Sequence, residues 1–98
     1  MITGFTGSGT EDVFNGKNTS AARRTCPRFL WSVAFRKLDQ LDSAIELSDL
    51  AIPRGNRLET LKGDKQGQHG IRVNDQYRVC FRWTAAGPVD VEIVDYHK

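Results

Sequence analysis

The sequence of 98 residues contains only two cysteines, two histidines and three prolines. Cys26 and Cys80 are too few and too far apart for a disulfide framework or a zinc site, so we interpret both as reduced thiols. We expect no metal and no cofactor. No apolar run approaches the roughly 20 residues of a membrane span, and the N-terminal stretch "MITGFTGSGTEDVF" lacks the basic and apolar regions of a secretory segment. These absences predict a cytoplasmic protein with no membrane partner.

The length is near that of a common single domain, and we predict one domain over residues 1–98. The net charge is +2. Residues 1–53 carry six bases and six acids, whereas residues 54–82 carry seven bases against three acids. A local basic excess is compatible with a phosphate-containing partner, although charge alone favours a solvated surface.

Hydrophobic spacing divides the chain into a helical part and a strand-rich part. Thr10 or Ser8 is predicted to cap a short helix that ends at Asn15–Gly16. A longer helix follows Pro27, with an apolar stripe predicted to face the core: Leu30, Ala34, Leu38, Leu41 and Ile45. From residue 57 onward the period is two, which predicts an antiparallel meander of four strands: "RLETLKG", "QHGIRV", "QYRVCFRW" and "VDVEIVDY". The fold class is therefore α+β.

The apolar faces of these strands predict their register, since a slip of one residue would mix polar and apolar faces. A loop of Asn74, Asp75 and Gln76 sets three pairs on the helix-covered face: Val73 with Tyr77, Ile71 with Val79, and His69 with Phe81. The next hairpin, with "TAAGP" as its loop, is predicted to pair Trp83 with Val89, Phe81 with Val91, Val79 with Ile93, and Arg82 with Asp90.

The opposite face then carries Arg72 directly across from Arg78. Arg82 is explained by an ion pair with Asp90, but two cations side by side are unfavourable without a partner. Either Glu92 or solvent satisfies them, or an anion lies between them, close to Tyr96.

Several segments resemble the HigB host-inhibition toxins of the RelE/ParE superfamily. The resemblance rests on "LKGD", "IRVNDQYR" and the terminal "DYH", and on their order along essentially the whole chain. It implies the RelE-like fold, in which N-terminal helices pack on one face of an antiparallel sheet. It also implies a type II toxin that enters the ribosome and cleaves messenger RNA there. A HigA-like helix-turn-helix antitoxin is the implied partner, and contact with operator DNA is expected only through that antitoxin.

The resemblance implies catalytic roles for five residues. Arg78 matches the catalytic arginine, Lys62 a basic position that contacts phosphate, and Asp95, Tyr96 and His97 the terminal acid, tyrosine and histidine. Arginine suits this chemistry because its guanidinium is always charged and binds two phosphate oxygens. Histidine exchanges a proton near neutral pH, and tyrosine stacks on a base or donates to phosphate. Four further residues are expected to contact RNA: Arg57, Glu59, Lys65 and Arg72.

Glu59 departs from the pattern, because several active HigB toxins have a histidine there. The carboxylate is either a general base or a sign of poor cleavage, so a non-nucleolytic inhibitor that binds gyrase or disturbs ribosome biogenesis remains an alternative. A decayed module that only titrates the antitoxin is a third reading. His69 stands where an aromatic residue is usual, and we interpret it as packing against Phe81.

Overall fold

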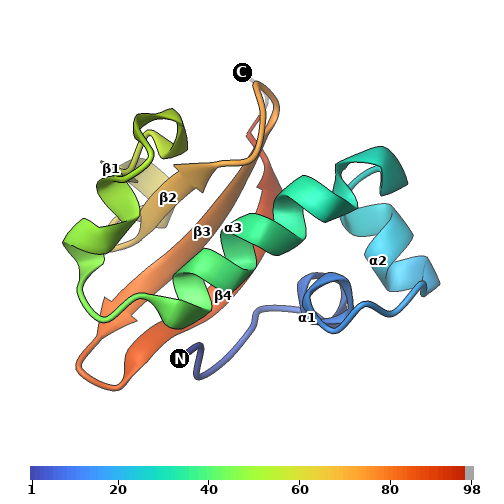
Figure 1. Cartoon of the computed structure of the whole chain (residues 1–98), viewed down its shortest axis with the longest axis horizontal. Coiled ribbons are helices and arrows are strands. Elements are labelled where there is room, and N and C mark those ends of the chain that lie inside the picture. The colour runs from blue at the N-terminus through green and yellow to red at the C-terminus, as the bar shows by residue number, and fades with distance from the viewer. Residues whose placement is uncertain (97–98) are drawn as a thin grey trace.

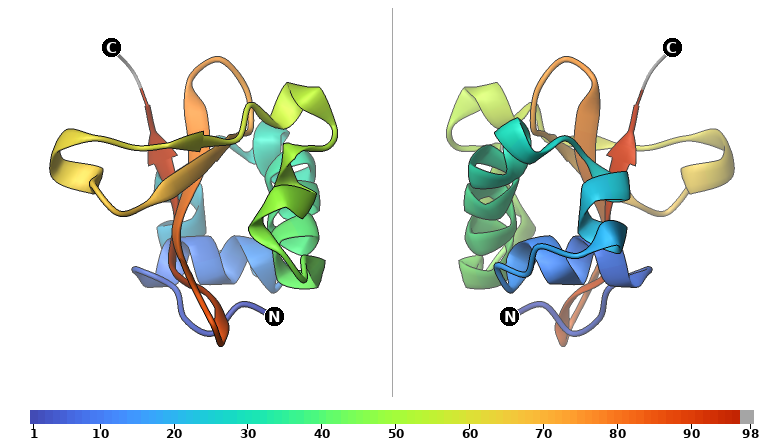
Figure 2. Two further views of the ribbon diagram at one scale, coloured as in Figure 1. Left: turned by 90° about the vertical axis from the view of Figure 1, so that its left-hand side faces the viewer. Right: turned by 90° about the vertical axis from the view of Figure 1, so that its right-hand side faces the viewer.

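The computed structural model describes residues 1–96. Helices come first and strands second, and the four strands form one antiparallel sheet in the order β1-β2-β3-β4. Figures 1 and 2 show the longest helix on one face of this sheet and the two shorter α-helices beyond one of its edges. The elements are α1 (Ser8–Phe14), α2 (Ser20–Thr25), η1 (Arg28–Leu30), α3 (Trp31–Ser43), η2 (Leu47–Ala51), η3 (Arg54–Asn56), β1 (Glu59–Thr60), η4 (Gly63–Lys65), β2 (His69–Arg72), β3 (Tyr77–Thr84) and β4 (Gly87–Asp95).

Helix α3 lies across the sheet, and its apolar stripe fills the core. Leu30, Ala34, Leu38 and Leu41 are buried, as the spacing predicts. The inclusion of Ile45 in that stripe is wrong, because the helix ends at Ser43 and Ala44 already has an extended backbone. Ile45 is 87% exposed.

The start of α1 differs from the prediction. Its N-cap is Gly7, and no side chain caps the helix, so neither Ser8 nor Thr10 has the predicted role. Thr10 is instead buried, and its Oγ1 accepts a hydrogen bond from the backbone N–H of Ile93 at 2.9 Å. This bond ties α1 to β4, because an unpaired N–H in the core would be costly. The predicted end of α1 at Asn15–Gly16 is confirmed.

The register of the first hairpin is confirmed. Ile71 pairs with Val79 and His69 with Phe81, and the N–H of Val73 donates to the carbonyl of Tyr77. The buried apolar face fixes this register, as the alternation of the two strands indicates.

The second hairpin has the predicted register only at the end away from its loop. Val79 pairs with Ile93, but Trp83 pairs with Pro88 rather than Val89, and the loop is reduced to Ala85–Ala86. The register shifts between Cys80 and Arg82, where Asp90 on β4 has a φ of 54°. Such a bulge inserts one residue into a strand, which the spacing of apolar residues does not reveal.

The bulge changes the backbone partners of Arg82 but preserves its predicted ion pair. Arg82 lies opposite Val89 instead of Asp90, yet Arg82 Nε is 3.4 Å from Asp90 Oδ2. A partly exposed pair of this kind contributes only about 0–1 kcal/mol to stability. Near the N-terminus, Phe5 forms one parallel bridge with Val91.

Residues 1–96 contain neither a candidate membrane span nor a candidate metal-binding cluster. None of the helices there is both long and apolar enough to cross a bilayer. No group of three or more potential metal ligands occurs in the same part of the chain.

Candidate functional site

The sheet face away from the helices carries two rows of residues. One row crosses from Arg72 through Arg78 to Val94. The other contains the directly paired residues Glu59, Gly70, Cys80 and Glu92. The predicted placement of Arg72 across from Arg78 is therefore confirmed. We refer to this surface as the open face.

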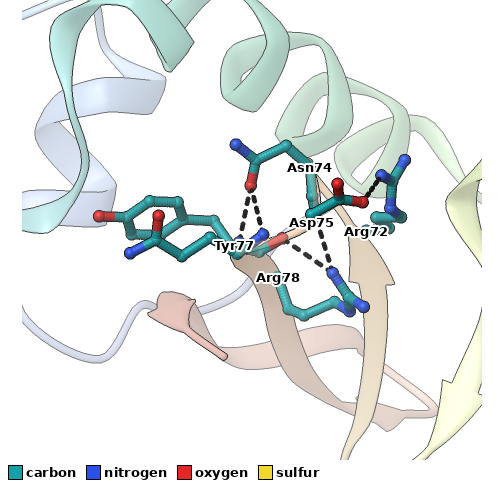
Figure 3. Close-up of polar contacts among 6 residues, drawn as sticks. Arg72, Asn74, Asp75, Tyr77 and Arg78 are labelled. Atoms are coloured by element: carbon teal, nitrogen blue, oxygen red, sulfur yellow. Dashed lines mark hydrogen bonds and ion pairs between the residues drawn. The ribbon is translucent and has the colours of Figure 1, made fainter. Parts of the chain in front are cut away.

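Arg78 is held at the start of β3 by carbonyl groups rather than by an acid. Its Nη1 donates to the carbonyl of Asn74 at 2.7 Å and more weakly to that of Tyr77 at 3.3 Å (Figure 3). The guanidinium carbon lies 5.3 Å from the centroid of the Tyr96 ring, a cation–π contact. Within residues 1–96, its buried Nε has no hydrogen-bond partner. The arginine is thus fixed in place by two carbonyl groups and an aromatic ring, and none of these contacts is with an acid.

The turn between β2 and β3 organises this arrangement. The side-chain oxygen of Asn74 accepts hydrogen bonds from the backbone N–H groups of Gln76 (2.9 Å) and Tyr77 (2.8 Å). The carbonyl of Gln76 then accepts from the N–H of Tyr96 at 2.6 Å. One turn therefore positions both Arg78 and the ring that stacks on it.

Asn74 was not among the predicted site residues. The sequence did contain a sign of this role, which is the position of Asn74 at the start of a tight turn. An asparagine there commonly accepts a hydrogen bond from the backbone N–H two residues further on. Its carbonyl contact with Arg78 depends on the rotamer of a long side chain, which strand spacing does not specify.

Arg72 has a partner that the sequence analysis did not identify. Its Nη2 forms an ion pair with the carboxylate of Asp75, three residues on (Figure 3). The hydrogen bond and charge of Arg72 lower the pKa of Asp75, and the charges of Arg57 and Arg78 lower it further. Three predicted RNA-contacting or catalytic arginines are therefore close enough to act on one exposed carboxylate. Asp75, and not Glu92, is the acid bonded to Arg72.

Cys80 lies at the centre of the second row and is fully buried. Burial raises the pKa of its thiol to about 11, and the charges of Lys65 and Arg78 oppose this effect while those of Glu92 and Glu59 add to it. A thiol with such a pKa stays protonated at neutral pH, so Cys80 is not a nucleophile. Glu92 is paired directly with Cys80, and Glu59 lies two strands away in the same row.

The segment between β1 and β2 folds over part of the open face (Figure 2). Leu61 is buried and packs over Gly70, where an added Cβ would lie 3.5 Å from Leu61 Cδ2. Gly67 has a φ of 89°, and a Cβ there would come within 2.7 Å of Arg82 Nη1. These contacts place the segment that carries Lys62 and Lys65 beside the sheet. Lys62 itself is exposed.

The remaining candidates are distributed differently. Asp95 pairs with Tyr77, so alternation directs it to the face opposite Arg78, and its Oδ2 accepts from Gln76 Nε2 at 3.1 Å. Arg57 is exposed, with a φ of 47°. His97 lies outside the described residues. His69 packs against Phe81, with ring centroids 5.9 Å apart, as predicted.

An open face with a fixed, charged arginine beside a tyrosine ring and flanking lysines is suited to binding phosphate groups. The family described as "RelE-like toxin of type II toxin-antitoxin system HigB" matches residues 8–97. The chain therefore belongs to the HigB-like toxins of type II toxin-antitoxin systems. Toxins of such systems have an antitoxin partner.

Two individual proteins are similar to this chain in sequence. The chain is 50% identical over 60 residues to Toxin HigB-1 of Vibrio cholerae, which covers 61% of the chain and 63% of that protein. It is 37% identical over 57 residues to a Haemophilus influenzae protein of no assigned function, covering 58% of the chain and 56% of that protein. The chain thus spans less than two thirds of these relatives in the matched regions.

The YoeB-YefM complex from Staphylococcus aureus contains a chain with the same fold. It aligns with a TM-score of 0.61 over 100% of this chain and 97% of that chain, at 16% sequence identity. Helices packed on a four-stranded antiparallel sheet, shared with this neighbour, confirm the α+β RelE-like fold.

Proposed function

We propose that residues 1–98 form one cytoplasmic toxin domain that cleaves messenger RNA on the ribosome and thereby arrests translation and growth. The observation that carries this proposal is the state of Arg78. Its guanidinium is stacked on Tyr96 and tied to the Asn74 carbonyl, while Nε has no partner in residues 1–96. A preorganised cation that is held by carbonyl groups and an aromatic ring suits a phosphate that gains negative charge in the transition state.

Cleavage of this type requires the 2′-oxygen of a ribose to attack the adjacent phosphate. Arg78 would stabilise the added charge, and Tyr96, half-buried against it, would donate to phosphate or stack on a base. Lys62, Lys65, Arg57 and Arg72 would hold the RNA backbone by charge. Proton transfer is assigned to Asp95 and His97, with Glu59 as a further base. Asp95 lies on the face of the sheet opposite Arg78. Its proposed role is therefore to orient His97, and not to contact the phosphate.

The partner proposed to neutralise the toxin is a HigA-like helix-turn-helix antitoxin. Operator DNA would be contacted by that antitoxin rather than by this chain. The messenger RNA would be presented by the ribosome, because the open face carries no complete acid–base pair beside Arg78 within residues 1–96. Cleavage of free RNA by the isolated protein is therefore expected to be weak.

A second candidate is an inhibitor that binds its target without cutting RNA. The observation in its favour is the pair of carboxylates in the second row of the open face, Glu59 and Glu92, both of which act on the Cys80 thiol. Negative charge so near the site would repel phosphate and weaken RNA binding.

Primer extension on a message in a reconstituted translation reaction separates the two candidates. Wild type, Arg78→Ala and the matched control Arg54→Ala are compared; Arg54 is exposed on η3. We expect codon-phased cuts from wild type and Arg54→Ala and a loss of at least about 100-fold in Arg78→Ala, as for removal of one transition-state donor. An intact message together with growth arrest would instead establish the binding inhibitor.

A further inference from the structure

The balanced charge of residues 1–53 conceals a separation along the chain. All six bases of this segment lie between Lys17 and Lys37, and no acid occurs between Asp12 and Asp39. The two ion pairs found within residues 1–96 join Arg72 to Asp75 and Arg82 to Asp90, so none of the six bases is paired with a carboxylate there. The helical layer therefore carries a block of uncompensated positive charge.

Part of this block is concentrated where α2 leads into α3. Arg23 and Arg24 are exposed in the last turn of α2, and Arg28 is exposed in η1 immediately beyond Pro27. Phe29 is 80% exposed. We call these residues, together with Trp31, the helical corner; it lies at the end of α3 next to α2 in Figure 1.

The helical corner is held in shape by its own contacts. The guanidinium carbon of Arg28 lies 5.7 Å from the centroid of the Trp31 ring. Trp31 Nε1 donates to the carbonyl of Cys26 at 2.9 Å, and Cys26 is buried in the core. Arg23 Nη1 donates to Asn18 Oδ1 at 2.7 Å. Phe29 is thus an exposed aromatic ring on a fixed support, and three arginines precede it in the sequence.

Phe29 is the most exposed aromatic side chain among residues 1–96, and it directly follows the exposed Arg28. An aromatic face beside arginines is the combination that single-stranded RNA uses, because bases stack on the ring and phosphates pair with the guanidinium groups. An acidic peptide would match the charge, but it would not explain a flat, isolated ring next to Arg28 as well.

The helical corner is close to the end of the sheet that carries Arg78. Burial raises the pKa of the Tyr77 hydroxyl, and the charges of Asp95 and Cys26 raise it further. Both groups therefore lie close enough to Tyr77 to interact with it. Tyr77 directly precedes Arg78 on β3, and the two side chains leave the strand in different directions (Figure 3). The helical corner therefore lies on the helix-covered side of the sheet, and a contact there would be separate from the Arg78 site on the open face.

We propose that the helical corner is a second RNA contact, at which Phe29 stacks on an unpaired base while Arg24 and Arg28 bind the adjoining phosphates. The inference rests on the proposed RNA-directed function and names a substrate contact outside the Arg78 site. It requires single-stranded RNA and no particular sequence.

Fluorescence anisotropy with a labelled 12-nucleotide RNA tests this contact. The RNA is 2′-O-methylated throughout, so binding is measured without cleavage. The full-length proteins are wild type, Phe29→Ala, Phe29→Trp, Arg28→Ala, Arg78→Ala and the control Arg54→Ala. Phe29→Ala should weaken binding about fivefold or more, and Phe29→Trp should restore it, because stacking is supplied by any aromatic face. Arg28→Ala should reduce the slope of log K against log salt by about 0.7.

The controls keep this inference separate from the proposed nuclease. Arg78→Ala should abolish cleavage in the translation reaction. In the binding assay, adding Phe29→Ala to Arg78→Ala should weaken RNA binding by the same factor as adding Phe29→Ala to wild type. Arg54→Ala should bind like wild type. Binding of Phe29→Ala and Arg28→Ala within twofold of wild type would overturn the inference. It would also be overturned if these variants kept RNA binding but lost binding to a labelled poly-glutamate peptide, which would make the corner a protein-binding site.

Discussion

Replacing Asn74 with alanine should impair catalysis more than folding. The substitution removes the Oδ1 atom that accepts from the N–H groups of Gln76 and Tyr77. A hydrogen bond contributes about 0.5–1.5 kcal/mol net, so two predict a loss of about 1–3 kcal/mol in the free energy of unfolding. The turn would then no longer hold its carbonyl 2.7 Å from Arg78 Nη1. Because a misplacement of about 1 Å costs roughly 100-fold, cleavage should fall by about that factor.

Two assays together test this reasoning. Urea unfolding gives the stability of each variant, and single-turnover cleavage in the translation reaction gives the rate under conditions where every variant is folded. Asn74→Asp keeps an oxygen acceptor and should recover most of the rate. Asn15→Ala, at the exposed end of α1, is the matched control. A rate for Asn74→Ala within twofold of wild type would refute the role of the turn in positioning Arg78.

Two further predictions concern stability and protonation. Thr10→Val should lower the free energy of unfolding by about 1–3 kcal/mol in urea, because it leaves the buried N–H of Ile93 without its acceptor; an unchanged midpoint would contradict this. Cys80 should not react with a thiol reagent at pH 8 unless the protein unfolds, since its pKa is about 11. As pH rises from about 9, the unfolded state ionises this thiol before the folded state does, so stability should fall between pH 9 and 11 in a denaturant titration, and less in Cys80→Ala.

The sequence predicted the elements whose pattern is local. The spacing of Leu30, Ala34, Leu38 and Leu41 predicted α3, and the two-residue period predicted β2, β3 and β4. The register of β2 on β3 followed because only one alignment keeps Ile71 on the buried face.

The predictions failed where one residue was controlled by a distant part of the chain. Thr10 appeared to be a helix cap, but it bonds to a strand 83 residues away. The bulge at Asp90 changes the pairing of Trp83 because the backbone there takes a positive φ, which an aspartate tolerates and a hydrophobicity pattern does not record.

For the site, the sequence by itself determined which residues are available and which face of the sheet they occupy. Alternation placed Arg78 across from Arg72, and a phosphate partner was one of the alternatives that these residue types left open. Tertiary structure decided how Arg78 is held: by the Asn74 carbonyl on one side and the Tyr96 ring on the other. The physical reason is that periodicity fixes the direction of a Cβ atom, whereas the end of a long side chain is fixed only by the groups it meets in the folded chain.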